Sequence, residues 1–125
     1  MTGRERRDLD ALLASERERL VAAEAELLTE HQAIVEASDR ANLDDEHDPE
    51  GATVGFERAR AASLLRHVRA RLSELDDASE RLRTGAYGHC ERCGQPIAFE
   101  RLAAHPTATR CIGCANFRLA ARPGA

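Results

Sequence analysis

Apolar residues recur every seven positions in two separate stretches, and this pattern constrains the fold most. The first stretch, from about Arg4 to Ala41, contains no Pro or Gly. Its spaced residues are Leu9, Leu13, Leu20, Leu27 and Ile34, and those of the second stretch are Val54, Ala61, Val68, Leu75 and Leu82, with Leu65 and Leu72 between them. Each pattern predicts a helix with one apolar seam. Two such helices joined by a short linker bury their seams only against each other, so the sequence predicts a long antiparallel coiled-coil hairpin.

The linker of this hairpin is an acidic segment at about 42–52, where charge density and Pro49 interrupt the repeat. Asp48 is a good helix N-cap, and Pro49 suits the first helical position after it. The second helix is expected to end near Thr84, because Gly85 supplies a C-terminal stop. At 1.5 Å per residue this second arm is roughly 45–50 Å long.

Composition agrees with helices packed through narrow seams. The 125 residues include 23 Ala but one Tyr, three Phe and no Trp, which is too little large apolar volume for a thick core. The net charge of −4 argues against a protein that coats nucleic acid. It hides an asymmetry, since residues 1–52 hold six Arg against 15 Asp and Glu, and residues 53–125 hold 12 Arg against seven.

The start of the chain, Met1 to Asp10, is charged, and no apolar run approaches the length of a membrane span. We therefore expect a cytoplasmic protein without membrane contact. In a reducing cytosol, four clustered cysteines are more suited to holding a metal than to forming disulfides.

The cysteines form the pattern Cys90-x2-Cys93-x17-Cys111-x2-Cys114, which falls in the spacing range of zinc ribbons. Two intervening residues let one tight turn present both sulfurs to one ion, and Gly94 permits the left-handed residue that ends such a turn. The second pair opens a short helix over about 112–121, whose N-terminal dipole favours thiolates. The sequence predicts one structural Zn²⁺ held by four thiolates, with no position left for water or substrate.

The module around the cysteines has few apolar residues to bury. We expect its core to come from Ile97, Phe99, Leu102, Ile112, Phe117 and Leu119, with zinc supplying most of its stability. A redox-switched thiol pair is an alternative or additional property of the same cysteines. His89 and His105 are expected at the surface, since four sulfurs already complete a zinc site.

The segment Gly85-x-Tyr87-Gly88-x-Cys90-x2-Cys93-Gly94, continuing through Arg101-Leu102, Pro106 and the second cysteine pair, resembles the DksA/TraR zinc-finger family of bacterial transcription regulators. The resemblance implies an all-α fold in which residues 1–84 form the hairpin and residues 85–125 form the zinc finger with a C-terminal helix. It also implies direct binding to RNA polymerase, with the coiled coil entering the secondary channel to modulate initiation. The alarmone (p)ppGpp at the polymerase interface is a further implied ligand, and no specific DNA site is expected.

In this family the hairpin tip carries the pattern Asp-x-x-Asp-x-Ala and approaches the polymerase active centre. Asp45 and Asp48 have the acidic spacing, but Glu50 stands where Ala would follow. The resemblance therefore implies Asp44, Asp45, Asp48 and Glu50 as the partner-binding tip. The residues also have structural explanations: Asp48 as a helix cap, and the other acids as a means of keeping a loop soluble.

The sequence is compatible with three classes of function. The leading hypothesis is a monomeric regulator that binds RNA polymerase. We do not expect an enzyme, because no nucleophile–base set, phosphate-binding glycine loop or open metal site is present. A DNA-binding zinc ribbon is the second, supported by arginines of the module: Arg92, Arg101, Arg110, Arg118 and Arg122. A structural coiled-coil interaction protein is the third. Five arginines of the second helix, Arg58, Arg60, Arg66, Arg69 and Arg71, suit either a solvated face or a specific contact.

Overall fold

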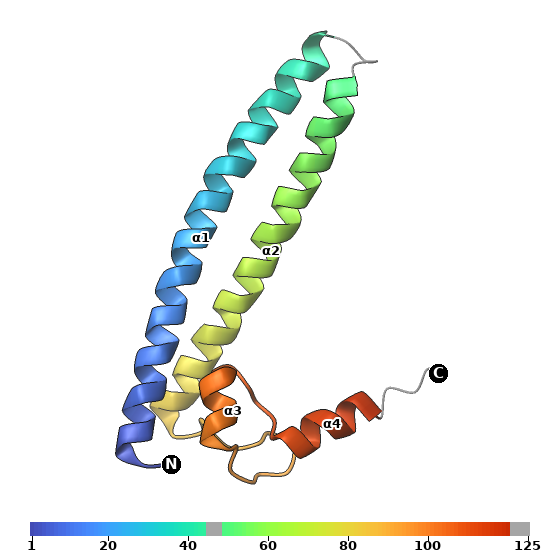
Figure 1. The fold of residues 1–125 in the computed structure, drawn as a ribbon. Helices are drawn as coiled ribbons and strands as arrows, with labels where there is room; N and C mark the ends of the chain where they lie inside the picture. The colour runs from blue at the N-terminus through green and yellow to red at the C-terminus, as the bar shows by residue number, and fades with distance from the viewer. Residues whose placement is uncertain (45–48, 121–125) are drawn as a thin grey trace. The chain divides into compact units, whose positions relative to one another are not determined.

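The structure, a computed structural model, describes residues 1–44 and 49–120, and its regular elements are helices. Helix α1 spans Gly3–Asp44 and α2 spans Pro49–Thr84. Two short helices follow, α3 over Phe99–Ala104 and α4 over Ile112–Ala120 (Figure 1). The described ranges contain no strand, and an isolated antiparallel bridge pairs His89 with Pro96. The predicted all-α class with a hairpin, a four-cysteine module and a short final helix is confirmed.

The bounds of α2 agree with the sequence prediction, and those of α1 differ at one end. Helix α2 begins at Pro49 and ends at Thr84, where Gly85 adopts a φ of +84°. Helix α1 continues to Asp44, so the predicted end near Ala41 is wrong by three residues. The reason is that residues 42–44 include neither Pro nor Gly, and the first Pro comes at position 49.

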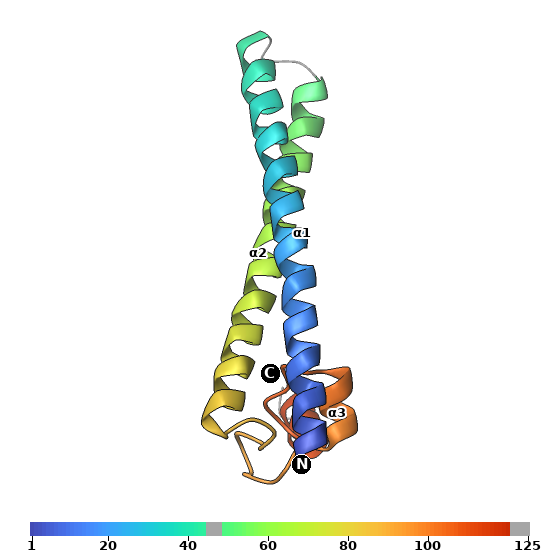
Figure 2. The same ribbon diagram turned by 90° about the vertical axis from the view of Figure 1, so that its left-hand side faces the viewer.

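The chain divides into two compact units. One, here the finger unit, comprises Met1–Arg17 and Ser73–Ala125; the other, here the hairpin unit, is Glu18–Leu72. In each unit a segment of α1 runs antiparallel to a segment of α2, as the two side views show (Figures 1 and 2). The predicted antiparallel pairing therefore holds within both units.

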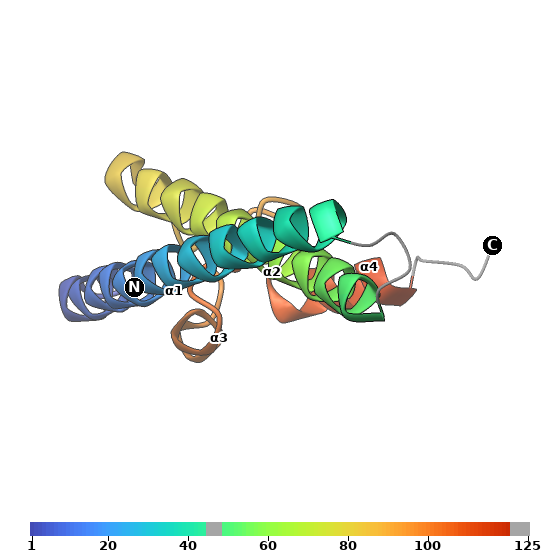
Figure 3. The ribbon, with the colours of Figure 1, turned by 90° about the horizontal axis from the view of Figure 1, so that it is seen from above.

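The hairpin unit is held by a narrow seam. Its buried side chains among the described residues are Leu20 from α1 and Ala61 and Leu65 from α2. Other seam positions, such as Leu27 and Val68, are only half-buried. The view from above shows these parts of α1 and α2 lying next to each other (Figure 3). The small alanine side chains explain the thin core that the composition predicts.

The finger unit has a denser core. Leu9 and Leu13 of α1 and Leu102 of α3 are 1–2% exposed. The remaining buried apolar residues of this unit are Leu75, Ala78, Leu82, Tyr87, Ile97, Cys90 and Cys114. This core packs α1 and α2 against α3 and against the loops that contain the cysteines.

Side-chain hydrogen bonds fix the ends of the helices in the finger unit. Thr2 and Glu5 form a capping box: the Thr2 N–H donates to Glu5 Oε2 at 2.8 Å, and the Glu5 N–H donates to Thr2 Oγ1 at 3.1 Å. Arg6 Nη2 donates to the Leu82 carbonyl at 2.6 Å, satisfying an otherwise open C-terminal acceptor of α2. The start of α1 is thereby tied to the end of α2.

None of the described helices is apolar over a stretch long enough to traverse a lipid bilayer.

Candidate metal centre

The first cysteine pair lies on a tight turn after α2. The Gly94 N–H donates to the Cys90 carbonyl at 2.9 Å, and the Cys90 N–H donates to the Gln95 carbonyl at 2.8 Å. Gly94 has a φ of +75°, which confirms the left-handed position predicted for it. Cys90 is buried and Cys93 is exposed. The turn thus presents one sulfur from the interior and one from the surface side.

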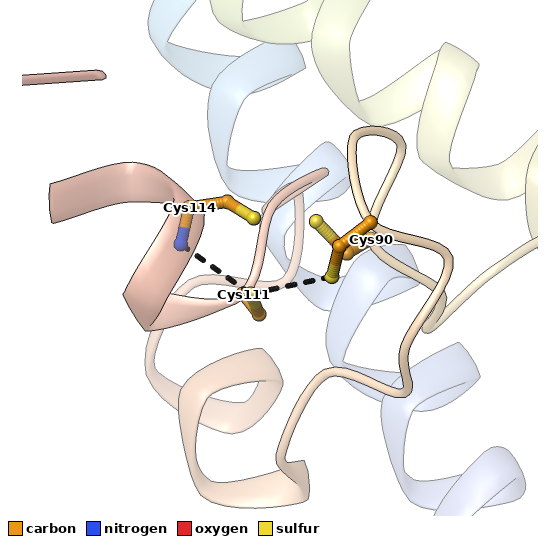
Figure 4. Close-up of side chains that lie close together, drawn as sticks. Cys90, Cys111 and Cys114 are labelled. Carbon is orange, nitrogen blue, oxygen red and sulfur yellow. Dashed lines mark hydrogen bonds between the residues drawn. The ribbon is translucent and has the colours of Figure 1, made fainter. Parts of the chain in front are cut away.

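The second pair lies at the start of α4. Cys111 directly precedes the helix, and its Sγ accepts the backbone N–H of Cys114 at 3.4 Å. Figure 4 shows Cys111 and Cys114 facing the loop that carries Cys90. The N-terminal end of a helix stabilises negative charge, so this position favours thiolates, as the sequence predicts.

All four sulfurs gather at one point. The Sγ atoms of Cys90, Cys93, Cys111 and Cys114 lie within 4.8 Å of one another. The Sγ atoms of Cys93 and Cys111 are 3.8 Å apart, and the four cysteines are free of disulfides. Zn–S bonds of about 2.3 Å in a tetrahedron place sulfurs about 3.8 Å apart. The sulfur spacing therefore fits a tetrahedral zinc ion.

The charges of the cluster also call for a cation. Backbone N–H groups of Cys93 and Cys111 lower the pKa of the Cys90 thiol to about 6. The Cys114 N–H likewise lowers the pKa of Cys111. The neighbouring Cys111 thiol group raises the pKa of Cys114 to about 12, because a further negative charge in the cluster is unfavourable. A bound divalent cation compensates this repulsion and lets all four sulfurs ionise.

Hydrogen bonds hold the two cysteine loops in register. The Tyr87 hydroxyl donates to the Pro106 carbonyl at 2.7 Å. Arg101 Nε donates to the Arg110 carbonyl at 2.8 Å, and Arg110 Nε pairs with Glu91 Oε1 at 3.0 Å. The three contacts join the segment before Cys111 to the residues that follow α2, to α3 and to the turn between Cys90 and Cys93.

Arg92 bridges the two halves of the cluster. It lies between Cys90 and Cys93 in sequence, yet its Nη1 is 3.9 Å from the Cys114 Sγ. Its guanidinium also stacks over the Phe117 ring of α4, 3.9 Å from the ring centroid. A cation at this position offsets part of the negative charge that a four-thiolate zinc site carries.

The outcomes for the predicted site residues differ between the finger and the tip. The structure brings the four cysteines together, and His89 and His105 are exposed as expected. Asp45 and Asp48 lie outside the described residues. Asp44 is the last residue of α1, and Glu50 lies in the first turn of α2. The side chains of both residues are likewise outside the described part.

The predicted core of the module is wrong at two positions, and the side chain of Leu119 lies outside the described residues. Ile112 is 62% exposed and Phe117 is 54% exposed, because α4 directs these side chains to solvent and, for Phe117, to Arg92. Tyr87, which is 2% exposed, was not expected in this core. A signal for it exists, since the chain's one tyrosine stands between Gly85 and Gly88, whose φ angles are positive.

Helix α3 and the roles of Arg101 and Arg110 were also missed by sequence reasoning. Six residues are too few to show periodicity, and the two arginines act through backbone carbonyls and one carboxylate that are distant in sequence. The pattern alone therefore offered no signal for these contacts.

Fold and site together define a class of protein, a four-cysteine zinc finger that follows a long helical hairpin. The prokaryotic dksA/traR C4-type zinc finger family matches residues 85–117. The RNA polymerase-binding transcription factor DksA of Caulobacter vibrioides is 34% identical over 103 residues, which cover 77% of this chain and 68% of that protein. The chain belongs to the DksA/TraR family. Membership and the sulfur cluster together support one structural Zn²⁺ as cofactor.

Two further comparisons extend the likeness. The RNA polymerase-binding transcription factor DksA of Haemophilus influenzae is 34% identical over 98 residues, covering 67% of this chain and 63% of that protein. The solved structure of transcription factor DksA2 from Pseudomonas aeruginosa has a TM-score of 0.80 and 28% identity, covering 98% of this chain and 88% of that chain. The similarity in fold thus extends well beyond the finger.

Proposed function

We propose that this chain is a bacterial transcription regulator that binds RNA polymerase directly and has no chemistry of its own. The observation that carries the proposal is similarity over 77% of the chain to a protein named for polymerase binding, together with a matching fold over 98% of it. The function so proposed is that of a cytoplasmic binding protein, acting as a monomer.

In this proposal Cys90, Cys93, Cys111 and Cys114 are the zinc ligands. Four thiolates complete a tetrahedral shell, so the metal supplies structure and not catalysis. The chain's own part is to orient the sulfurs through the two turns and to hold the loops together through Tyr87 and the Glu91 carboxylate. Residues 85–125 then act as the finger, and residues 1–84 as the hairpin.

The finer proposal is that the hairpin enters the polymerase secondary channel and modulates initiation. The 36 residues of α2 correspond to a helix about 54 Å long, which supports such a reach. Asp44, Asp45, Asp48 and Glu50 would then lie near the catalytic Mg²⁺, where carboxylates alter the local field. The alarmone (p)ppGpp at the polymerase interface belongs to the same proposal.

The contacts of the finger speak against the DNA-binding alternative. Arg101 and Arg110 bind groups within the module, and Arg92 lies against Cys114 and Phe117. Three of the five arginines that supported this alternative are thus engaged internally. A four-thiolate zinc site adds negative charge to the same surface, which further weakens attraction to a polyanion.

The proposal is tested with the zinc-loaded protein and purified core RNA polymerase. We expect binding that is lost in the presence of a factor known to occupy the secondary channel. Duplex DNA at low salt serves as the comparison. Tight binding to DNA with none to polymerase would overturn the proposal in favour of a DNA-binding ribbon.

The tip is tested separately with the triple variant Asp44→Asn, Asp45→Asn and Asp48→Asn. Asn caps a helix about as well as Asp, so the change removes charge and keeps the cap. We expect polymerase affinity to remain within a few-fold of wild type while the effect in an initiation assay falls. Regulation as strong as wild type would show that the tip charges do not act at the active centre.

A further inference from the structure

Two contacts join the side chain of Arg92 to α4. Arg92 stands between Cys90 and Cys93 in the first cysteine turn, and its Nη1 lies 3.9 Å from the Sγ of Cys114. Its guanidinium carbon also lies 3.9 Å from the centroid of the Phe117 ring. One side chain thus connects the first cysteine turn to the helix that carries the last of the four sulfurs.

The spacing of Cys114 and Phe117 explains how one guanidinium reaches both residues. Side chains three positions apart on a helix are neighbours on the same face. Cys114 and Phe117 have this spacing within α4. A planar guanidinium stacks on a ring through its face and keeps the N–H groups at its edge for other partners. The stack on Phe117 therefore determines where the N–H groups of Arg92 point.

The surroundings of Arg92 and Phe117 favour this contact. Glu91, the carboxylate next to Arg92 in sequence, pairs with Arg110 at 3.0 Å. Phe117 is 54% exposed, so it contributes little to the core of the finger unit. Cys114, by contrast, is only 7% exposed. An exposed arginine and an exposed aromatic ring thus meet beside a buried sulfur.

A guanidinium at this position acts on the Cys114 sulfur in two ways. Four thiolates leave a zinc site with a net negative charge, and a nearby cation offsets part of it. A donor that bonds to a metal ligand also holds that ligand in place, and removing such a partner weakens metal binding about 10–100-fold in other proteins. Arg92 supplies both the positive charge and the N–H donor.

We propose that Arg92 and Phe117 form a latch that fastens Cys114, and with it α4, to the first cysteine turn and thereby slows the loss of zinc. Arg92 is a positioning residue for the metal ligand, and Phe117 in turn positions Arg92. The inference goes beyond the proposed function, because it concerns how firmly the cofactor is held. It does not depend on polymerase binding.

The first test follows the release of zinc from the zinc-loaded protein to an excess of a coloured chelator at neutral pH. Arg92→Ala is expected to release zinc about ten-fold faster or more, because the sulfur loses its donor and its nearby cation. Phe117→Ala is expected to accelerate release about two- to five-fold, as for a cation–π contact at an exposed site. Release from Arg92→Ala at the wild-type rate would overturn the proposal.

A double variant distinguishes a latch from two independent effects. Because Phe117 acts through Arg92 in this proposal, Phe117→Ala should add nothing to the release rate once Arg92→Ala is present. An equal acceleration by Phe117→Ala in both backgrounds would show that Phe117 stabilises the finger by itself, and the latch would be wrong.

Two further variants test whether the ring of Phe117 is required. Phe117→Tyr keeps an aromatic face and should release zinc within about two-fold of the wild-type rate. Phe117→Leu keeps an apolar side chain without a ring, so it should release zinc as fast as Phe117→Ala. A wild-type rate for Phe117→Leu would contradict the stacking on which the latch depends.

The absorption spectrum of the cobalt-substituted protein reports on the sulfurs directly. Loss of an N–H donor raises the energy of a thiolate lone pair, so the thiolate-to-cobalt band of Arg92→Ala is expected at longer wavelength than that of wild type. An unshifted band would show that Arg92 does not donate to a bound sulfur and would overturn the proposal. Arg92 is exposed, so its truncation leaves no cavity in the core, and the Phe117 variants provide the same test if Arg92→Ala does not hold metal.

Two matched controls lie in the same unit. Arg7 is an exposed arginine of α1, and Ile112 is a 62% exposed apolar residue of α4. Arg7→Ala and Ile112→Ala should each release zinc within about two-fold of the wild-type rate, because neither residue belongs to the latch. Release from both controls as fast as from Arg92→Ala would mean that any loss of surface charge or of apolar surface loosens the finger, and the specific role of the latch would be refuted.

Discussion

The two units of this chain are stabilised in different ways, although α1 and α2 run through both. In the finger unit, Leu13 and Leu102 are almost fully buried, and a four-sulfur cluster joins distant loops. In the hairpin unit the seam is narrow, Leu27 is half-buried, and Phe56 is left in solvent. The comparison teaches that the same two helices are packed by a dense core within the finger unit, and within the hairpin unit leave apolar surface that the fold itself does not bury.

Removing zinc should have the largest effect on the difference in stability between the two units. Structural zinc contributes on the order of 10–16 kcal/mol in finger peptides, far more than the few apolar residues of this module. We expect chelation, or Cys114→Ser, to abolish amide exchange protection around Cys90 and Ile97. Protection near Leu65 in α2 should persist, because its seam contains no metal ligand. Simultaneous loss in both units, or retained protection in a zinc-free finger, would contradict this difference.

Deleting the same side chain in each unit should reveal their different packing. Leu13 and Leu27 both lie in α1, so Leu→Ala has the same propensity effect at each. Leu13→Ala, at a position 2% exposed, is expected to cost about 2–5 kcal/mol of unfolding free energy. Leu27→Ala, at a half-buried position, should cost roughly 1 kcal/mol. Denaturant unfolding measures both, and equal losses would mean that the hairpin unit packs as tightly as the finger unit.

A smaller effect is expected from the tyrosine that links the loops of the finger. Tyr87→Phe removes the hydrogen bond to the Pro106 carbonyl and should cost about 1 kcal/mol, seen as faster zinc release to a chelator. Burial raises the pKa of Tyr87 above its ordinary value of 10.0. The folded state then favours the neutral phenol, so its contribution is full below pH 10 and is lost as pH rises through the folded pKa. Tyr87→Phe should lack this part of the alkaline destabilisation.

The smallest effects are expected from the ion pairs that cross between α1 and α2. Arg17 pairs with Asp76 at 2.9 Å in the finger unit, and Arg69 pairs with Glu24 at 3.1 Å in the hairpin unit. The first pair is exposed and the second is partly exposed, so double-mutant cycles should give coupling energies below about 1 kcal/mol that fall with salt. A coupling of several kcal/mol in the hairpin unit would show that charges, and not its seam, hold that unit together.

The sequence predicts the helices and the cysteine cluster well because both depend on local spacing. A heptad repeat predicts an apolar seam whichever helix packs against it, and two Cys-x2-Cys turns predict a tetrahedral four-thiolate metal site. The end of α1 was predicted three residues too early because charge density was taken as a break, whereas residues 42–44 contain neither Pro nor Gly and remain helical.

What the sequence does not reveal are the contacts between distant residues. The burial of Tyr87, the exposure of Ile112 and the Arg92–Phe117 stack depend on how α4 leaves the second cysteine pair. No periodicity encodes that direction. Likewise, a groove lined by Ala33 and Ala37 of α1 and by Val54 and Glu57 of α2 becomes visible only once α1 and α2 are paired.

The antiparallel pairing of α1 and α2 also sets an order of assembly. Glu24 and Arg69 are separated by 45 residues, Arg17 and Asp76 by 59, and Arg6 and Leu82 by 76. Once the inner pair has met, each outer pair closes at little further loop entropy, since even a doubling of loop length costs only about 0.6 kcal/mol. We therefore expect the helices to zip from the turn outward, with the cysteine loops ordering last. The supply of metal would then limit the final step of folding and leave the earlier steps unaffected.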